Sequence, residues 1–223
     1  MFDIRGRITQ YEKEMTEYEN KGIQEGLIMF YGDSAFTRWS EKFGNTNLED
    51  DICMKDGSVA AVNHGLGGSN TEQLLYRYNR MVKPWKPRAL VLKTYNNDRD
   101  AGYTPNEIVF LQSRILEWVR RDFPGIKLYV CDAKPILLDK DRKLIWYHHQ
   151  LEYNDLIAAY CAKHEDVKLV KLSCMPELYE NEEESGDYTK VRTDVWIEDQ
   201  VHFNAKGYEL FKDFWLRELD DLL

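Results

Sequence analysis

Five short runs of apolar and β-branched residues recur along the chain and predict five β-strands. Each run is continuously hydrophobic rather than alternating, which is typical of strands buried on both faces of a parallel sheet. The runs are Leu27–Tyr31, Val59–Asn63, Ala89–Lys93, Ile126–Cys131 and Val167–Leu172. We therefore expect a central sheet with helices packed against both of its faces.

Amphipathic patterns with helical spacing lie between these runs. Asn70–Met81 carries two leucines and a tyrosine at helical intervals. Thr104–Glu107 forms a capping box with proline at the first helical position, which predicts a helix that extends to about Asp122. Further helices are expected at Ile8–Asn20, Gln150–Lys163 and Ala205–Leu222.

This alternation of strands and helices predicts an α/β fold, a three-layer α/β/α sandwich with right-handed crossovers. Five parallel strands suit the doubly wound, flavodoxin-like order. The chain shows no internal repeat and no linker, so residues 1–223 are expected to form a single domain. Two polar stretches, Glu41–Asp56 and the acidic insertion Glu177–Asp194, are expected to be irregular, and charge runs of this kind are most often solvated.

Composition and charge exclude several classes of protein. Of the 223 residues, 43% are hydrophobic and 31% are charged, which excludes collagen-like, disordered and membrane-spanning chains. Thirty basic residues against 39 acidic ones give a net charge of −9. Without a basic stripe, such a chain is poorly suited to a phosphate backbone, so we expect no nucleic-acid partner.

The cysteines and the N-terminal residues indicate the compartment. Cys53, Cys131, Cys161 and Cys174 form no Cys-x-x-Cys pair and have no histidine at ligand spacing, so we expect no metal site. We interpret them as small buried side chains in a reducing compartment. The N-terminal residues contain no apolar signal core. We therefore expect a cytoplasmic protein with no membrane partner, and the oligomeric state stays open.

Candidate chemistry follows the predicted strands, where ligands bind in open α/β sheets. Ser34 lies where the first strand turns toward a helix, which directs its hydroxyl to the cleft, although an ordinary helix-capping serine has the same pattern. Asp199 and His202 are three residues apart, so one short turn presents both side chains together. A carboxylate beside a histidine is the supporting half of a serine triad.

Two candidate oxyanion donors follow the second and third strands. Gly67-Gly68 permits a close backbone approach and offers an N–H group, although a phosphate cradle without the full P-loop signature is an alternative. Asn97 carries a neutral amide donor, and asparagine is also common in turns. Together these signals place a nucleophile, oxyanion donors and an Asp–His pair in one cleft.

On these residues the chain resembles the SGNH (GDSL-type) hydrolase family. The resemblance lies in four blocks that occur in the family's order, namely Phe30–Ser34, Val62–Gly68, Tyr95–Asp98 and Asp199–Tyr208. It is greatest to a bacterial branch with a tryptophan five residues after the nucleophile, here Trp39. The similarity extends from the N-terminal helix to the last one.

The resemblance implies a carboxylic ester hydrolase that forms an acyl-enzyme and needs no cofactor. Ser34 would be the nucleophile, His202 its base and Asp199 the carboxylate that orients the histidine. The N–H groups of Ser34 and Gly68 and the side chain of Asn97 would form the oxyanion hole.

Three aromatic residues near these blocks are candidates for substrate contact. Tyr95 replaces the family's glycine, and its ring is expected to narrow the acyl pocket. His64 precedes the glycine loop, and Trp39 with its neighbour Arg38 would rim the cleft, although tryptophan is more often buried. The expected substrate is a small-molecule or carbohydrate ester with a short acyl group, acetyl above all.

Three alternatives stay open. A lipase or thioesterase of the same fold would use the same residues. A metal-dependent phosphatase would gather Asp33, Asp98 and Asp132 at neighbouring strand ends, but would leave Ser34 without a role. A non-catalytic ligand-binding module would keep the cleft without the reaction.

Overall fold

Five parallel strands form the centre of the protein. The computed structural model describes residues 10–137 and 145–223. The strands are β1 (Ile28–Gly32), β2 (Ala61–Gly65), β3 (Ala89–Lys93), β4 (Lys127–Cys131) and β5 (Val167–Val170). They pair in the order β2-β1-β3-β4-β5 with every pairing parallel, which confirms the flavodoxin-like sheet.

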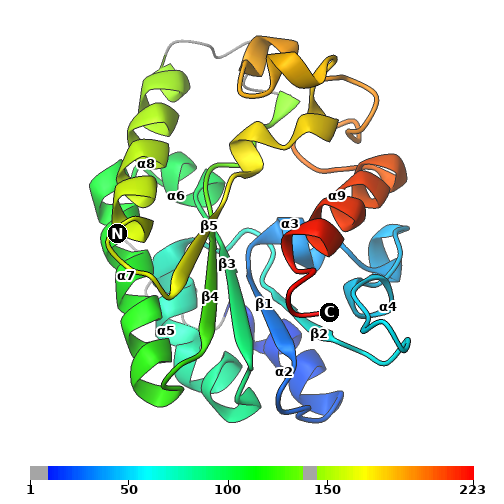
Figure 1. Ribbon diagram of the computed structural model, residues 1–223, viewed down its shortest axis with the longest axis vertical. Coiled ribbons are helices and arrows are strands. Elements are labelled where there is room, and N and C mark those ends of the chain that lie inside the picture. Colours follow the sequence, from blue (N-terminus) through cyan, green and yellow to red (C-terminus); the bar gives the residue numbers. More distant parts are fainter. Residues whose placement is uncertain (1–9, 138–144) are drawn as a thin grey trace.

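The helices cover both faces of this sheet (Figure 1). They are α2 (Glu12–Asn20), α3 (Ser34–Thr37), α4 (Leu48–Asp51), α5 (Thr71–Met81), α6 (Asn96–Asp100), α7 (Pro105–Asp122), α8 (Ile145–Cys161) and α9 (Ala205–Glu218). The capping box expected at Thr104 and Glu107 opens α7, since each side chain bonds the other's backbone N–H. The expected positions 8 and 9 of the first helix lie outside the described residues.

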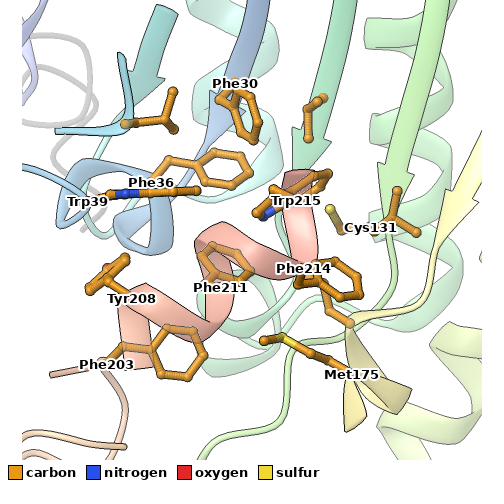
Figure 2. Close-up of a cluster of buried hydrophobic side chains, with 14 of the residues drawn as sticks. Phe30, Phe36, Trp39, Cys131, Met175, Phe203, Tyr208, Phe211, Phe214 and Trp215 are labelled. Atoms are coloured by element: carbon orange, nitrogen blue, oxygen red, sulfur yellow. The ribbon is translucent and has the colours of Figure 1, made fainter. Parts of the chain in front are cut away.

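Two hydrophobic clusters lie on opposite faces of the sheet. Phe30 points into the cluster under α3, α4 and α9, whereas its neighbours Met29 and Tyr31 point into the cluster under α5, α7 and α8. Figure 2 shows the first cluster, where Phe30, Phe36 and Trp215 pack edge to face. Burial on both faces explains why the sequences of the central strands read as apolar runs, whereas the edge strand β5 exposes Lys168.

The observed strand β2 starts two residues later than the expected Val59–Asn63. Val59 instead pairs with Cys53 in an isolated antiparallel bridge before the chain enters the sheet. The shift carries His64 and Gly65 into the strand, opposite Tyr31 and Gly32 of β1. Both residues therefore lie inside the sheet rather than in the loop that follows it.

The acidic insertion at 177–194 is irregular, as expected, but it is anchored to the core. It folds into three short 3₁₀ turns, at Pro176–Leu178, Glu182–Glu184 and Tyr188–Lys190. Leu178 and Val191 are fully buried in the cluster beneath α9, while Glu182 and Glu183 face solvent. The segment therefore packs through its apolar residues and exposes its charges.

A membrane crossing needs about 20 consecutive apolar residues in a helix. In residues 10–137 and 145–223, no helix has both the length and the hydropathy for this.

Candidate active site

Ser34 stands at the carboxyl end of β1, where the chain turns directly into α3. Asp33 caps this short helix, because its Oδ1 accepts a hydrogen bond from the N–H of Ala35 at 3.0 Å. Gly65 makes the turn possible, since a Cβ at this position would lie 2.3 Å from the backbone nitrogen of Thr37. The missing side chain lets α3 rest against the end of β2 and holds Ser34 at the edge of the sheet.

His202 reaches Ser34 from the other end of the sequence. Its Nε2 lies 2.9 Å from the Oγ of Ser34, and its Nδ1 lies 2.6 Å from the Oδ2 of Asp199. The other carboxylate oxygen of Asp199 accepts from the backbone N–H groups of Val201 and His202, each at 2.9 Å. Since Nδ1 donates to the carboxylate, Nε2 is left to accept the Ser34 hydroxyl proton.

The charges around this pair favour a neutral histidine. Burial raises the pKa of Asp199, but hydrogen bonds from His202 and the two backbone N–H groups outweigh it and lower that pKa to about 2. Burial also lowers the pKa of His202, and the nearby Arg38 and Lys134 lower it further against the opposing effect of Asp199. The net pKa of His202 is lower than its ordinary value of 6.5.

This direction gives a prediction for the pH dependence of catalysis. Only neutral His202 can take the Ser34 proton, so kcat/KM should rise with pH through one ionisation below 6.5 and then stay level. Asp199, with a pKa of about 2, stays charged throughout and adds no second step. A pH profile with a neutral ester checks this, and a midpoint above that of free histidine would contradict it.

The expected oxyanion donors and Ser34 line the same cavity. The volume of this cavity is about 380 Å³. Gly68 has a φ of +78°, a left-handed backbone that glycine adopts without strain. The amide nitrogen of Asn97 donates one hydrogen to the carbonyl of Ser69 at 2.9 Å, which ties it to the glycine loop. An amide NH₂ carries two hydrogens, so a second remains for an oxyanion.

The structure corrects the expected role of His64 and Trp39, since neither side chain contacts this cavity. His64 is fully buried, with its Nδ1 at 2.7 Å from the carbonyl of Met81, and burial lowers its pKa to about 4. Trp39 is fully buried in the cluster of Figure 2, and its Nε1 donates to Asp51 at 2.7 Å. Trp39 is therefore a core residue, and the His64 ring lies between Tyr18 and Trp85, away from Ser34.

Tyr95 also differs from expectation, because its ring turns away from the cavity. It stacks on Tyr153 of α8 with ring centroids 4.4 Å apart, and its hydroxyl lies 3.2 Å from the Nδ1 of His149. The ring therefore does not narrow an acyl pocket. The φ of Tyr95 is +106°, a backbone conformation that favours glycine, the residue at this position in the SGNH family pattern. The contacts of the Tyr95 ring and hydroxyl offset a backbone strain of about 1–3 kcal/mol.

A buried ion pair beneath the nucleophile was not anticipated from the sequence. Lys93, the last residue of β3, places its Nζ 2.7 Å from the Oδ2 of Asp33. Lys93 is 1% exposed and Asp33 is 2% exposed, so both charges are removed from water. The signal that could have found this pair is a lysine that ends an otherwise apolar strand beside the first strand's Gly-Asp-Ser turn.

The carboxylates of the phosphatase alternative are engaged separately. Asp33 pairs with Lys93, Asp98 accepts the backbone N–H groups of Thr71 and Tyr95, and Asp132 accepts both N–H and hydroxyl of Ser173. Within the described ranges, no three His, Cys, Asp or Glu side chains gather in a way that could hold a metal ion. The three carboxylates therefore do not come together at one metal site, as the phosphatase alternative requires.

A serine, a histidine and an aspartate that are linked by hydrogen bonds at the carboxyl edge of a parallel sheet define a serine hydrolase site. The sequence agrees with this class of protein. Residues 30–210 match the model of the GDSL-like lipase/acylhydrolase family. The chain belongs to that family.

Solved structures of several other proteins have the same fold. A candidate acylhydrolase from Bacteroides fragilis is similar with a TM-score of 0.70 and 17% identity, over 100% of this chain and 100% of that one. A GDSL-like lipase from Bacteroides thetaiotaomicron has a TM-score of 0.67 and 16% identity, over 96% of this chain and 98% of that one. AlinE4, an SGNH-hydrolase family esterase, has a TM-score of 0.57 and 23% identity, over 90% of this chain and 97% of that one. Among curated proteins, none matches this sequence.

Proposed function

We propose that the protein is a serine esterase that removes a short acyl group, acetyl above all, from a polar alcohol such as a carbohydrate. The observation that carries the proposal is the hydrogen-bonded sequence of Ser34, His202 and Asp199, which opens on a cavity with two further oxyanion donors. Membership of the acylhydrolase family supports the general reaction.

The geometry supports a two-step reaction. His202 takes the hydroxyl proton as Ser34 Oγ attacks the ester carbonyl carbon, and the carbonyl oxygen becomes an oxyanion facing Gly68 and Asn97. A single such donor contributes about 3–4 kcal/mol. The intermediate collapses when His202 gives its proton to the departing alcohol, which leaves the acyl group on Ser34. Water then attacks this acyl-enzyme, with His202 again as the base and Asp199 holding its ring. The bond between the acyl carbon and Ser34 Oγ breaks, His202 returns the proton to Ser34, and the carboxylic acid leaves.

The lining of the cavity supports a short acyl group and a polar alcohol. Charged and amide side chains, among them Arg38, Lys93 and Lys134, share it with apolar ones such as Phe43 and Phe203. A long alkyl chain gains about 0.8 kcal/mol per methylene only where it meets apolar surface. The net charge of −9 also disfavours an approach to anionic lipid, so we infer a small-molecule substrate and no membrane or nucleic-acid partner.

The cysteines bear on where the enzyme works. Cys53, Cys131, Cys161 and Cys174 are all unpaired in the structure. Since disulfides are rare in reducing compartments, this supports action in the cytoplasm.

A fluorophosphonate probe tests the proposed reaction, because it reacts only with an activated serine. We expect one labelled site, at Ser34, and release of acetate from acetylated sugars by the same preparation. A protein that binds an acetylated sugar but leaves both Ser34 and the ester intact would be a ligand-binding module instead.

The acyl preference gives a further prediction. Across acetyl, butyryl, octanoyl and palmitoyl esters of one alcohol, kcat/KM should be highest for acetyl, since a cavity of about 380 Å³ that is lined in part by charged side chains offers a long chain little apolar surface. Tyr95→Gly should leave this order unchanged, because the ring lies against Tyr153 and outside the cavity. An optimum at octanoyl or longer in the unmodified protein would favour the lipase alternative.

A further inference from the structure

Two cationic side chains stand beside the catalytic histidine of a protein whose net charge is −9. Arg38 and Lys134 both line the cavity that holds Ser34 and His202. Both are close enough to His202 for their positive charge to lower its pKa. The reaction derived above uses neither of them.

Arg38 follows Ser34 by one helical turn, and its backbone N–H donates to the carbonyl of Ser34 at 3.0 Å. Its guanidinium lies 5.0 Å from the ring centroid of Phe43, which also lines the cavity. Stacking of this kind orders the guanidinium without neutralising it. Among the described residues, no carboxylate forms an ion pair with Arg38.

Lys134 approaches the site from the loop after β4. Its side chain is 4% exposed, with Nζ 3.1 Å from the carbonyl of Val201 and over the ring of Phe203 at 4.2 Å. A buried ammonium this close to the histidine loop contributes a positive potential that solvent screens little.

Several other charges around the cavity have partners within the protein. Lys93 pairs with Asp33, and Lys42 lies 3.5 Å from Glu17. The acidic Asp100 accepts a hydrogen bond from Arg99 at 3.1 Å. Glu14 of α2 also lines the cavity, on the side where Gly68 lies, so the cavity carries charges of both signs. Arg38 is therefore a cation of this cavity that is available to pair with an anion of the substrate.

We propose that the ester cleaved at this site carries an anionic group, a carboxylate or a phosphate, which binds against the Arg38 guanidinium in the field of Lys134. The proposal rests on the esterase function proposed above and specifies its substrate class. A planar guanidinium offers paired N–H donors that match either anion, and such charge-assisted bonds are the stronger kind. An anion would otherwise be repelled by the protein's overall charge, so this local cation also gives selectivity.

Matched esters that differ only in charge provide the test. On the acyl side, 4-nitrophenyl hydrogen succinate is compared with its neutral methyl ester. On the alcohol side, acetylated glycerol 3-phosphate is compared with acetylated glycerol. The assays are run at about pH 8.5, above the ordinary histidine pKa, so that a change in the ionisation of His202 does not contribute.

In at least one pair we expect kcat/KM to be about tenfold higher for the anionic ester, in line with a hydrogen bond to a charged group. Arg38→Gln should reduce that ratio to about twofold or less, and Arg38→Lys should restore part of it. Arg114→Gln removes the same charge from α7, where Arg114 pairs with Glu117, and should keep the full ratio. Circular dichroism establishes that each variant is folded.

An unmodified enzyme that prefers the neutral ester in both pairs would overturn the proposal, as would a ratio that Arg38→Gln leaves intact. The pair that shows the preference identifies whether the anion lies on the acyl or the alcohol side. Failure to cleave any of the four esters, with no fluorophosphonate label on Ser34, would instead overturn the esterase function itself.

Discussion

Replacement of Ser34 by alanine is expected to lower kcat/KM on an activated ester by at least about 10⁴-fold while the fold persists. The hydroxyl at 2.9 Å from His202 is the atom that forms the bond to the acyl carbon, and alanine leaves nothing in its place. His202→Ala should cost about as much, because without the base the hydroxyl is a poor nucleophile. Steady-state assays with 4-nitrophenyl acetate measure both losses.

The combination of the two changes distinguishes a triad from independent contributions. Members of a triad act as a unit, so the double variant should be no slower than either single one. Ser113→Ala is the matched control, since that hydroxyl only donates to the carbonyl of Phe110 on the surface of α7. Normal turnover by folded Ser34→Ala protein would show that another residue carries the reaction.

Lys93→Met is expected to lower the free energy of unfolding by about 3–5 kcal/mol. The substitution removes the ammonium 2.7 Å from Asp33 and leaves a carboxylate that is only 2% exposed without its partner. Urea denaturation monitored by tryptophan fluorescence measures the loss. Asp33 also caps α3, so the esterase rate should fall together with the stability.

The double variant Lys93→Met/Asp33→Asn separates the charge from the packing. A neutral amide still accepts the N–H of Ala35 but leaves no buried charge, so most of the lost stability should return. Lys127→Met is a matched control, because that lysine pairs with Asp221 at the exposed end of β4 and should change little. A double variant as unstable as Lys93→Met would mean that the lysine acts through its packing.

The sheet could be predicted from the sequence because its central strands are buried on both faces. Such strands are continuous apolar runs, and five of them separated by helices allow few topologies. The position of Ser34 followed from the same reasoning, since it comes directly after β1 at one edge of the sheet. His202 followed from its spacing to Asp199 before the last helix and from the resemblance to the hydrolase family. The separation of 2.9 Å between Ser34 and His202, across 168 residues of sequence, required the structure.

The side-chain directions at the substrate positions could not be predicted. A shift of two residues in the start of β2 moved His64 from a loop into the sheet, between Tyr18 and Trp85. The direction of the Tyr95 ring depends on a backbone with φ at +106°, which no local pattern indicates for tyrosine. The partner of Lys93 is 60 residues away, and only the pairing of β1 with β3 brings the two together.

The short turn that holds Asp199 and His202 has a consequence for how this enzyme can vary in evolution. The histidine and its carboxylate are oriented within four residues, and backbone N–H groups of the same turn fix the carboxylate. Insertions or deletions in the preceding segment at 177–194 therefore cannot misalign the acid with the base. Within the triad, selection has one long-range distance to maintain, that from His202 to Ser34, so the segment at 177–194 is free to diverge in length as substrates change.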